Sequence, residues 1–288
     1  MKSRSGLWLT AWIGLAVILA CSFGPATSSP QSSVPTVVAA TLQALTSAAP
    51  AGNTVSYNNV SFVIPGGLAN GASSQTVPVG TAQNSAPWEV APQHTEFKLT
   101  GYNLPSGYFQ VMMIDVYPAQ DYAAVYDGAS IGIQRLQAFL ASPSSPVTTE
   151  NLPQVPYFNA GALFDAKVKI IHFANGSGVR MVTQYGQAVG PVINAGTFYD
   201  FEGLSSDGKY YLVVVLPVEA PFLPSGANPT AAPPAGGIPF PDYNNPDHTV
   251  FDHYYQAITE KMNATPDDVF QPSLSTLDSL VQSIQLNP

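Results

Sequence analysis

The spacing of apolar residues changes along the chain, and these changes predict where strands give way to helices. Alternation of apolar and polar residues, or a short apolar run bounded by turn residues, is typical of strands. In the first half of the chain such runs lie at 55–64, 95–102 and 108–117. The segment 68–93 between them is rich in Gly, Ser and Asn, and we expect a long loop there.

Helical spacing replaces this alternation at three places. The predicted helices span 130–141, about 248–262 and about 273–286. In the first of them Ile133, Leu136 and Phe139 share one side, and Pro143 follows its end. The two C-terminal helices carry similar apolar stripes. We expect all three helices to pack these sides against a sheet.

Two tight turns predict hairpins in the middle of the chain. Asn175-Gly176 and Asp207-Gly208 each separate two β-rich runs, and such pairs supply the positive φ angles that a short hairpin turn needs. The runs predict an antiparallel meander with strands at about 167–173, 179–189, 197–203 and 209–218.

The third strand of this meander alternates aromatic and acidic residues. Tyr199 and Phe201 point to one face, and Asp200 and Glu202 point to the other. We expect the aromatic face to be the core face. Arg180 on the neighbouring strand is expected to pair with Glu202 or Asp200 across the sheet.

Strands, a helix, the meander and C-terminal helices, in this order, predict an α+β fold with one antiparallel sheet covered by helices. The order, together with VSFVIPGGL at 60–68, resembles the PsbP-like sandwich. This resemblance implies a single domain with a non-enzymatic role. A Pro-rich loop is expected over 219–247, either as an extended recognition segment or as a simple exposed connection.

The N-terminus has the layout of a secretory signal. Lys2 and Arg4 precede an apolar run from Gly6 to Ala20, which is short for a helix that crosses the bilayer and needs about 20 apolar residues. The alternative is an uncleaved anchor. Ile18-Leu19-Ala20-Cys21 resembles the lipobox of bacterial lipoproteins, although Leu19 stands where a small residue is usual. The resemblance implies cleavage before Cys21 and acylation of its thiol.

These features divide the chain into three parts. Residues 1–20 are expected to be a signal peptide, and 21–53 a lipid attachment site with an uncharged, flexible spacer rich in Ser, Thr, Ala and Pro. Residues 54–288 are expected to form the single α+β domain. The expected location is the extracytoplasmic face of the cell membrane, with attachment through lipidated Cys21.

Charge excludes some partners. The chain carries 9 basic and 18 acidic residues, and loss of Lys2 and Arg4 would change its formal charge from −9 to −11. Such a domain lacks the basic surface patch that nucleic-acid binding needs.

A single cysteine allows no intrachain disulfide. Walker A and G-x-G-x-x-G patterns are absent, so no cofactor is expected. The other expected partner is an unidentified extracytoplasmic protein or carbohydrate.

Gly128-Ala129-Ser130-Ile131-Gly132 matches G-x-S-x-G, the motif that exposes the nucleophile of α/β-hydrolases. A serine hydrolase or esterase that uses Ser130, with His248 or another downstream histidine such as His172 as its base, is therefore the alternative function. The antiparallel hairpins that follow do not suit this fold, which needs parallel βαβ units. Ser130 is otherwise expected to cap the N-terminus of its helix.

His248 and Asp252 are weak candidates for a metal site. They are four residues apart on a predicted helix, so that both side chains could face one ion. Metal sites usually need three or four ligands, and the nearby Asp242, Asp247 and His253 have simpler roles as a cap or a solvated face. No metal is therefore expected.

The domain is rich in aromatic residues that suit either a core or a binding surface. The set comprises Trp88, Tyr185, Tyr199, Tyr210, Tyr211, Tyr254 and Tyr255. Exposed aromatics beside Asn and Gln are typical of sugar- or peptide-binding surfaces, while buried ones fill a core. Core packing is the stronger interpretation for most of them. The main hypothesis is a non-catalytic binding or scaffolding domain, and a structural envelope component is a third.

Overall fold

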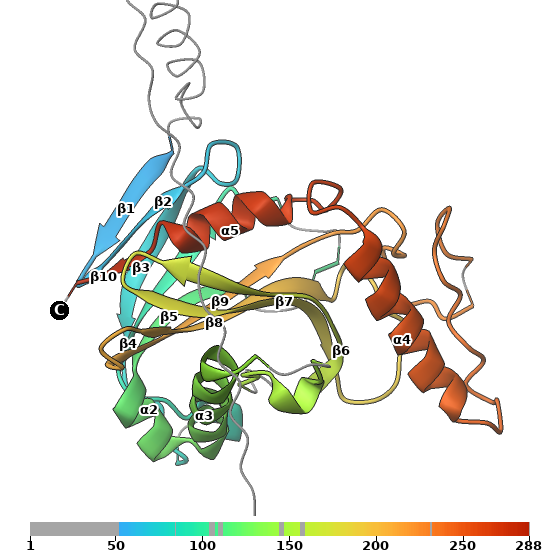
Figure 1. The fold of residues 1–288 in the computed structure, drawn as a ribbon, viewed down its shortest axis with the longest axis horizontal. Helices are drawn as coiled ribbons and strands as arrows, with labels where there is room; N and C mark the ends of the chain where they lie inside the picture. The colour runs from blue at the N-terminus through green and yellow to red at the C-terminus, as the bar shows by residue number, and fades with distance from the viewer. Residues whose placement is uncertain are drawn as a thin grey trace, which may run out of the picture. The chain divides into compact units, whose positions relative to one another are not determined.

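The computed structural model describes residues 52–83, 85–103, 107–108, 112–143, 147–155, 159–230 and 232–287 (Figure 1). The chain divides into a unit of Met1–Ser47 and a unit of Ala48–Pro288, and the described residues belong to the second. The predicted signal peptide, Cys21 and the spacer as far as residue 51 lie outside them.

In the described part of the chain, the strands form a seven-stranded and a three-stranded sheet, named here the large sheet and the small sheet. The large sheet has the order β3 (Gly71–Val77), β4 (His94–Thr100), β5 (Met113–Pro118), β9 (Tyr210–Pro217), β8 (Thr197–Ser205), β7 (Gly176–Gly186) and β6 (Gly161–Phe173). The small sheet has the order β1 (Asn53–Tyr57), β2 (Val60–Ile64) and β10 (Gln285–Leu286). Neighbouring strands are antiparallel in both sheets.

The meander predicted from the two turn signals is confirmed as β6 to β9. Gly208 has a φ of 72°, which a residue with a side chain rarely adopts, and the Asp207 carboxylate accepts hydrogen bonds from Ser205 Oγ at 2.7 Å and Lys209 N at 3.1 Å. The turn between β8 and β9 is therefore stabilised by the residues that predicted it. β6 begins at Gly161, six residues before the expected start at 167.

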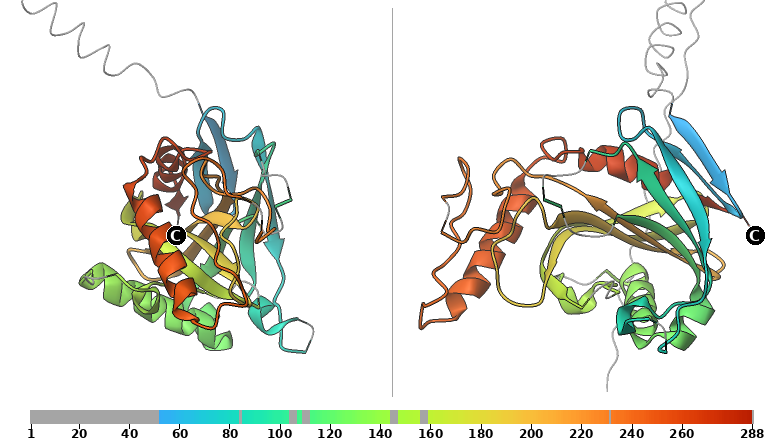
Figure 2. Two further views of the ribbon diagram at one scale, coloured as in Figure 1. Left: turned by 90° about the vertical axis from the view of Figure 1, so that its right-hand side faces the viewer. Right: turned by 180° about the vertical axis from the view of Figure 1, so that it is seen from behind.

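Helices lie on both faces of the large sheet (Figures 1 and 2). They are α2 (Ala119–Val125), α3 (Asp127–Ala141), α4 (Thr249–Ala264) and α5 (Leu274–Gln282). One face packs against α5, α4 and the small sheet, through a core that includes Phe62, Tyr199, Phe201 and Leu277. We name it the α5 face. The opposite face packs against α2 and α3 through Leu136, Phe198 and Tyr211, and we name it the α3 face.

The fold is α+β, as predicted, but helices cover the sheet only in part. On the α5 face the small sheet contributes Val60, Phe62 and Ile64 to the core beside α5. The last predicted helix ends at Gln282, and Gln285 and Leu286 pair with β2 instead. The expectation that helices alone cover the sheet was wrong, because β1, β2 and β10 form a second sheet that covers part of the α5 face.

Three other elements, β3, a short 3-10 turn and α2, escaped prediction. The segment expected to be a loop, 68–93, contains β3 and a short 3-10 turn, Pro87–Glu89. β3 is made of small and polar residues whose side chains are mostly exposed, so that its pairing with β4 depends on backbone hydrogen bonds and left no apolar pattern to detect. The short helix α2 was also missed.

Among the described helices, none combines the length and the apolar character that crossing a bilayer requires.

Candidate functional site

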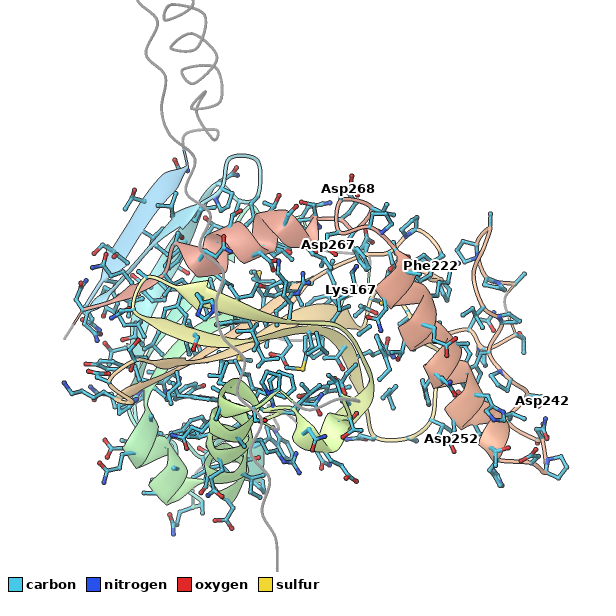
Figure 3. The ribbon with its side chains drawn as sticks, in the orientation of Figure 1. Lys167, Phe222, Asp242, Asp252, Asp267 and Asp268 are labelled. Atoms are coloured by element: carbon cyan, nitrogen blue, oxygen red, sulfur yellow. The ribbon has the colours of Figure 1, made fainter. Side chains whose placement is uncertain are left out.

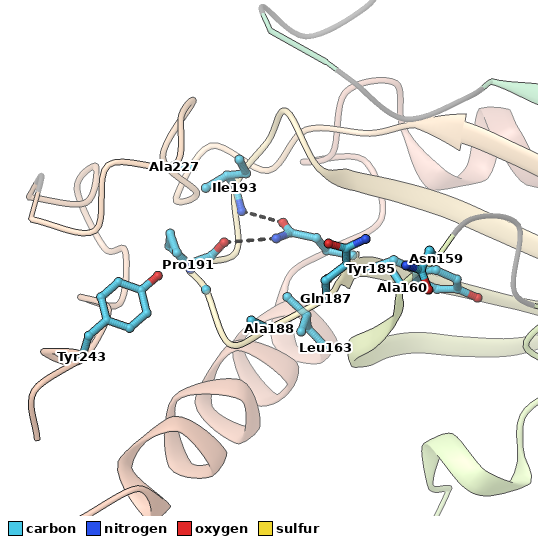
Figure 4. Close-up of a pocket in the computed structure, with 13 residues that line it drawn as sticks. Asn159, Ala160, Leu163, Tyr185, Gln187, Ala188, Pro191, Ile193, Ala227 and Tyr243 are labelled. Atoms are coloured by element: carbon cyan, nitrogen blue, oxygen red, sulfur yellow. Dashed lines mark hydrogen bonds between the residues drawn. The ribbon is translucent and has the colours of Figure 1, made fainter. Parts of the chain in front are cut away.

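A hollow of about 580 Å³ lies where β6 begins and β7 ends (Figure 4). It is lined by Asn159, Ala160, Leu163, Gln184, Tyr185, Gly186, Gln187, Ala188, Gly190, Pro191, Ile193, Ala227 and Tyr243. Figure 4 shows Tyr243 on one side of the hollow and Leu163, Tyr185 and Asn159 on the other. Three segments that are distant in sequence therefore build its wall: the end of β7, the start of β6 and the Pro-rich loop.

The loop that follows β7 is held in place by side-chain hydrogen bonds. The Gln184 amide accepts from Ile193 N at 2.8 Å and donates to Pro191 O at 3.1 Å. From α4, the Tyr255 hydroxyl accepts from Gly190 N at 2.8 Å and donates to Gly190 O at 2.9 Å. Because these bonds satisfy the loop backbone in both directions, the floor of the hollow is preorganised before any ligand arrives.

The Pro-rich loop is a wall of this hollow. Phe240 packs its ring against Tyr254 at 5.1 Å and against Phe251 at 5.6 Å, which anchors the loop to α4. Asn194 ties its beginning to the loop after β7, because Asn194 Oδ1 accepts from Ala220 N at 2.9 Å. Tyr243 is then presented with 46% of its surface exposed. Of the two expectations for segment 219–247, a contribution to a recognition surface fits this geometry better.

A second hollow of about 590 Å³ adjoins the first. The two share Asn159, Ala160, Gly186 and Gln187, and the second adds Pro87, Trp88, Tyr126 and Gly161. We name the joined hollows the β6–β7 groove. Among its described lining residues there is no Asp, Glu, Lys, Arg, His, Ser or Cys. The groove therefore offers aromatic rings, amides and backbone groups, but neither a charge nor a nucleophile of the usual catalytic types.

Tyr185 separates the groove from a buried acidic layer on the α3 face. Its side chain lines the groove yet is only 4% exposed. Burial raises the Tyr185 pKa well above its ordinary value, and the nearby carboxylates of Asp200 and Glu202 raise it further. Tyr185 is therefore a neutral phenol at physiological pH, and its ring forms part of an uncharged floor.

The structure places Ser130 inside α3, four residues after the N-cap residue Tyr126. Ser130 N donates to Tyr126 O at 3.1 Å, and Ser130 Oγ accepts from Gln134 Nε2 at 3.2 Å. The expectation that Ser130 caps the helix was wrong, since the helix begins at Asp127. No histidine is found within hydrogen-bonding distance of Ser130 in the part of the chain that the structure describes.

The glycines of the G-x-S-x-G pattern have packing roles. A Cβ at Gly132 would lie 2.7 Å from Val155 Cγ2, and one at Gly128 would lie 2.7 Å from the ring of Tyr126. Each glycine thus permits a close approach of α3 to its surroundings. His248 is the N-cap residue of α4, which packs on the α5 face, whereas α3 packs on the other. His172, on β6, is exposed.

The candidate metal ligands lie on the surface at the start of α4. His248, Asp252, Asp242, Asp247 and His253 are all exposed. Asp247 accepts hydrogen bonds from Thr249 N at 3.0 Å and Thr249 Oγ1 at 2.7 Å, so that it stabilises the first turn of the helix. Among the described residues, no group of three His, Cys, Asp or Glu side chains is placed to hold a metal ion. Figure 3 shows Asp242 and Asp252 near one end of α4 and Asp267 near the other.

The expected pairing of Arg180 with Glu202 or Asp200 was wrong. Arg180 points to the α5 face, where Arg180 Nη1 lies 3.3 Å from Asp278 Oδ1. Asp200 and Glu202 point to the α3 face, and both are fully buried. The aromatic face of β8 does face a core, but the acidic face is buried as well, because α3 covers it.

Sequence reasoning found part of the groove. Trp88 and Tyr185 line it, whereas most of the other aromatic candidates are core residues: Tyr199, Tyr211 and Tyr254 are at most 4% exposed. The groove residues Tyr126, Tyr243, Asn159 and Gln187 were missed. Tyr243 and Gln187 lie in connections that are rich in Pro and Gly and contain other amide side chains. This composition could have pointed to them, but such connections are common on protein surfaces.

Comparison of the chain with protein-family models, with curated proteins and with solved structures finds no match in any of the three.

Proposed function

We propose that this chain is the precursor of a membrane-anchored extracytoplasmic lipoprotein whose α+β domain binds a ligand in the β6–β7 groove without catalysing a reaction. The lipobox-like Ile18-Leu19-Ala20-Cys21 supports the anchor. The domain would then stand on its uncharged spacer outside the cytoplasm. Its proposed partners are the membrane, through Cys21, and an extracytoplasmic ligand. We further propose that the domain has a PsbP-like arrangement, which its element order supports.

One observation carries the binding function: the groove has a rigid, hydrogen-bonded frame and a lining without charges or common nucleophiles. Ligand sites are usually concave, largely preformed and apolar, with a few polar groups that orient the ligand. A hydrolase would need a base within hydrogen-bonding reach of its serine. Ser130 lies in α3 with Gln134 as its side-chain partner, which favours binding over hydrolysis.

Metabolic labelling with a lipid probe tests the anchor. We expect the wild-type chain to incorporate the probe and Cys21→Ser to incorporate none, because no other cysteine is present. Ser22→Ala, which changes the neighbouring residue and leaves the thiol, is the matched control and should be labelled like the wild type. Equal labelling of wild type and Cys21→Ser would rule out lipidation at Cys21.

Ligand-induced shifts of the melting temperature test the groove. A panel of sugars, short peptides and divalent ions is added to the wild-type chain and to Gly161→Phe. Gly161 lines the second hollow, and a Cβ there meets no atom within 4 Å, so we expect the backbone to accept a Phe whose ring occupies part of the groove. We expect a shift in the wild type that is lost in Gly161→Phe. A shift of equal size in both proteins would place the site elsewhere.

A further inference from the structure

The composition of the groove wall restricts the charge of its ligand. The protein has 27 ionisable Lys, Arg, Asp and Glu residues, 9 basic and 18 acidic, yet none of them is among the described residues that line the groove. A charged ligand would lose its hydration there without gaining an ion pair. A neutral ligand does not have this cost, so the groove selects against ions of either sign.

The aromatic residues of the groove are spread along it. Trp88 and Tyr126 lie in one hollow, and Tyr243 lies in the other, on the Pro-rich loop. All three are partly exposed rather than buried. An aromatic ring at a wet surface attracts flat, weakly polar C–H faces while its own polar end remains in water. The faces of pyranose rings have this character.

Two amides between these rings are free to bind a ligand. Asn159 and Gln187 are exposed, line both hollows, and have no hydrogen-bond partner in the described part of the chain. This differs from Gln184, whose amide is fully engaged with the loop backbone. A primary amide donates and accepts at once, which matches a hydroxyl group. The free amides therefore suit a ligand that carries several hydroxyls.

The size of the groove indicates a ligand of more than one ring. Each hollow, at about 580 and 590 Å³, is by itself within the roughly 300–1,000 Å³ of small-molecule sites. A ligand that contacts the separate lining residues of both hollows, such as Tyr243 in one and Trp88 in the other, needs more than one ring. The groove lies where β6 begins and β7 ends, with Gly161 paired to Gly186. β6 is an edge strand of the large sheet, so a peptide that pairs with this edge is the competing ligand, and the hexapeptide probe below tests it.

We propose that the β6–β7 groove binds a neutral oligosaccharide, with Trp88, Tyr126 and Tyr243 stacking on its rings and Asn159 and Gln187 binding its hydroxyls. This inference rests on the proposed binding function and names the class of its ligand. The ligand spans both hollows, so residues from the Pro-rich loop and from the connection before β4 contact the same molecule. The selectivity is for uncharged sugars over uronic acids and sulfated sugars.

Trp88 provides a direct signal for the test. The chain has three tryptophans, and in a full-length chain with Trp8→Phe and Trp12→Phe the only one left is Trp88. Its fluorescence is titrated with neutral hexasaccharides of β-1,4-glucose, α-1,4-glucose and β-1,4-N-acetylglucosamine. The hexamer of galacturonic acid and a polar hexapeptide serve as charged and peptide probes. We expect at least one neutral sugar to shift the emission with saturation, and the galacturonic acid hexamer to have no effect.

Variants link the signal to the proposed contacts. In the same background, Tyr243→Ala should weaken binding about tenfold, and Tyr243→Phe, which keeps the ring, should stay within about threefold of the parent. Gln187→Ala should weaken binding about fivefold, and Gln137→Ala, an exposed glutamine on α3, is its matched control. Gly161→Phe should abolish the shift. Unchanged melting temperatures show that each variant is folded.

The outcomes separate this inference from the proposed function. If the hexapeptide shifts the emission, the sugars do not, and Gly161→Phe abolishes the shift, then the groove is a binding site but the carbohydrate assignment is wrong. Tighter binding of the galacturonic acid hexamer than of any neutral sugar would overturn the proposed neutrality. If no sugar or peptide changes the emission or the melting temperature, both proposals fail.

Discussion

The two faces of the large sheet bury acidic residues in different ways. On the α5 face, Lys and Arg side chains contact both Asp267 and Asp278. Figure 3 shows Lys167 and Asp267 near each other. Lys167 Nζ lies 2.7 Å from Asp267 Oδ1, and Arg180 Nη1 lies 3.4 Å from Asp267 Oδ2. Asp278 is contacted by Arg180 at 3.3 Å, by Lys169 at 2.9 Å and by the Tyr199 hydroxyl at 3.1 Å. This network joins β6, β7 and β8 to α5 and to the turn before it.

On the α3 face, neutral donors take the place of these cations. Glu202 accepts from Val155 N at 2.8 Å and from the Tyr211 hydroxyl. Asp165 accepts from Thr149 Oγ1 at 2.6 Å and from the Gln154 amide. Within the described ranges, the Asp165 carboxylate does not lie within ion-pair distance of a Lys or Arg.

A third acid on this face, Asp115, has a histidine nearby. It accepts from the Tyr117 hydroxyl at 2.9 Å, and His94 Nε2 lies 3.9 Å away. Burial lowers the His94 pKa, so the imidazole is mostly neutral at pH 7 and contributes little positive charge. The His94 and Tyr117 rings contact each other at 4.4 Å between centroids.

The pKa values of the acids on the two faces show that neutral hydrogen-bond donors do not stabilise a buried carboxylate as well as cations do. Burial opposes ionisation of Asp267, yet hydrogen bonding and attraction from Lys167 and Arg180 together lower its pKa. On the other face, burial raises the pKa of Asp165 to about 6 and that of Asp115 to about 7, in spite of their hydrogen bonds. Hydroxyls and amides donate hydrogen bonds to a buried carboxylate. These bonds replace only part of the solvation free energy that the ionised carboxylate loses on burial.

Removing the buried cation of the α5 face should have the largest effect. Arg180→Met should lower the free energy of unfolding by about 3 kcal/mol, because it removes the buried cation that contacts the buried carboxylate of Asp278. Lys169→Met is the control, since Lys169 contacts the same carboxylate but is 51% exposed, against 3% for Arg180. Its cost should be below about 1 kcal/mol. Urea unfolding measures both, and equal costs would show that burial does not distinguish the two cations.

Changing the pH should weaken the α3 face selectively. The pKa values of Asp165 and Asp115 are about 6 and about 7 in the folded protein, against 3.8 for a free carboxyl. Between these limits the folded state holds protons that the unfolded state has lost, so stability falls as pH rises from about 4 to about 7. We expect a loss on the order of 2 kcal/mol by urea unfolding between pH 5 and pH 8.

Two other groups set the controls for this pH experiment. The lowered pKa of His94 acts in the opposite direction, because the unfolded state takes up a proton below about pH 6.5 that the folded state does not. The lowered pKa of Asp267 affects stability only below about pH 4. Asp115→Asn should therefore flatten the pH dependence, and Asp267→Asn should leave it unchanged between pH 5 and pH 8. A wild-type protein that is more stable at pH 8 would contradict this account.

Removing a single neutral donor should have the smallest effect. Tyr211→Phe deletes the hydroxyl that donates to Glu202 and keeps the ring, so that it should cost about 1–2 kcal/mol of unfolding free energy. Tyr210→Phe changes the adjacent residue, which is only half-buried, and should cost less than about 0.5 kcal/mol. Thermal unfolding of the pair gives the difference. No difference between them would show that the Tyr211 hydroxyl does not stabilise Glu202.

Local signals were enough to predict the meander. Asp207-Gly208 marked one turn, where Gly208 has the predicted positive φ, and a turn with a strand on each side determines an antiparallel pair. Asn175-Gly176 marked the other hairpin, but its turn residues are Ala174 and Asn175, and neither Asn175 nor Gly176 has the positive φ that was predicted. The helix 130–141 was also predictable, because Ile133, Leu136 and Phe139 repeat with helical spacing and are buried in α3. β10 was not predictable, since two residues that pair with β2 from the other end of the chain carry no local pattern.

The groove could be predicted only in fragments. Trp88 and Tyr185 were candidates as members of an aromatic-rich set, but nothing in their spacing showed that the Pro-rich loop would bring Tyr243 to the same wall. That contact depends on Phe240 packing against α4 and on Asn194 binding Ala220. Both are long-range interactions. The sequence therefore indicated residue types that suit binding, but it did not predict where in the fold these residues come together.

By itself the sequence determined an α+β chain with an antiparallel meander, an acidic domain with few cations, and a cysteine that follows an apolar segment. Periodicity and turn chemistry act between neighbouring residues, so they can be read along the chain. Only the tertiary structure decided which cation contacts which acid. Alternation along β7 and β8 predicts which residues share a face of the sheet, but it does not predict which helix covers that face. α5 supplies Asp278 to Arg180, whereas Val155 N and the Tyr211 hydroxyl donate to Glu202 on the other face.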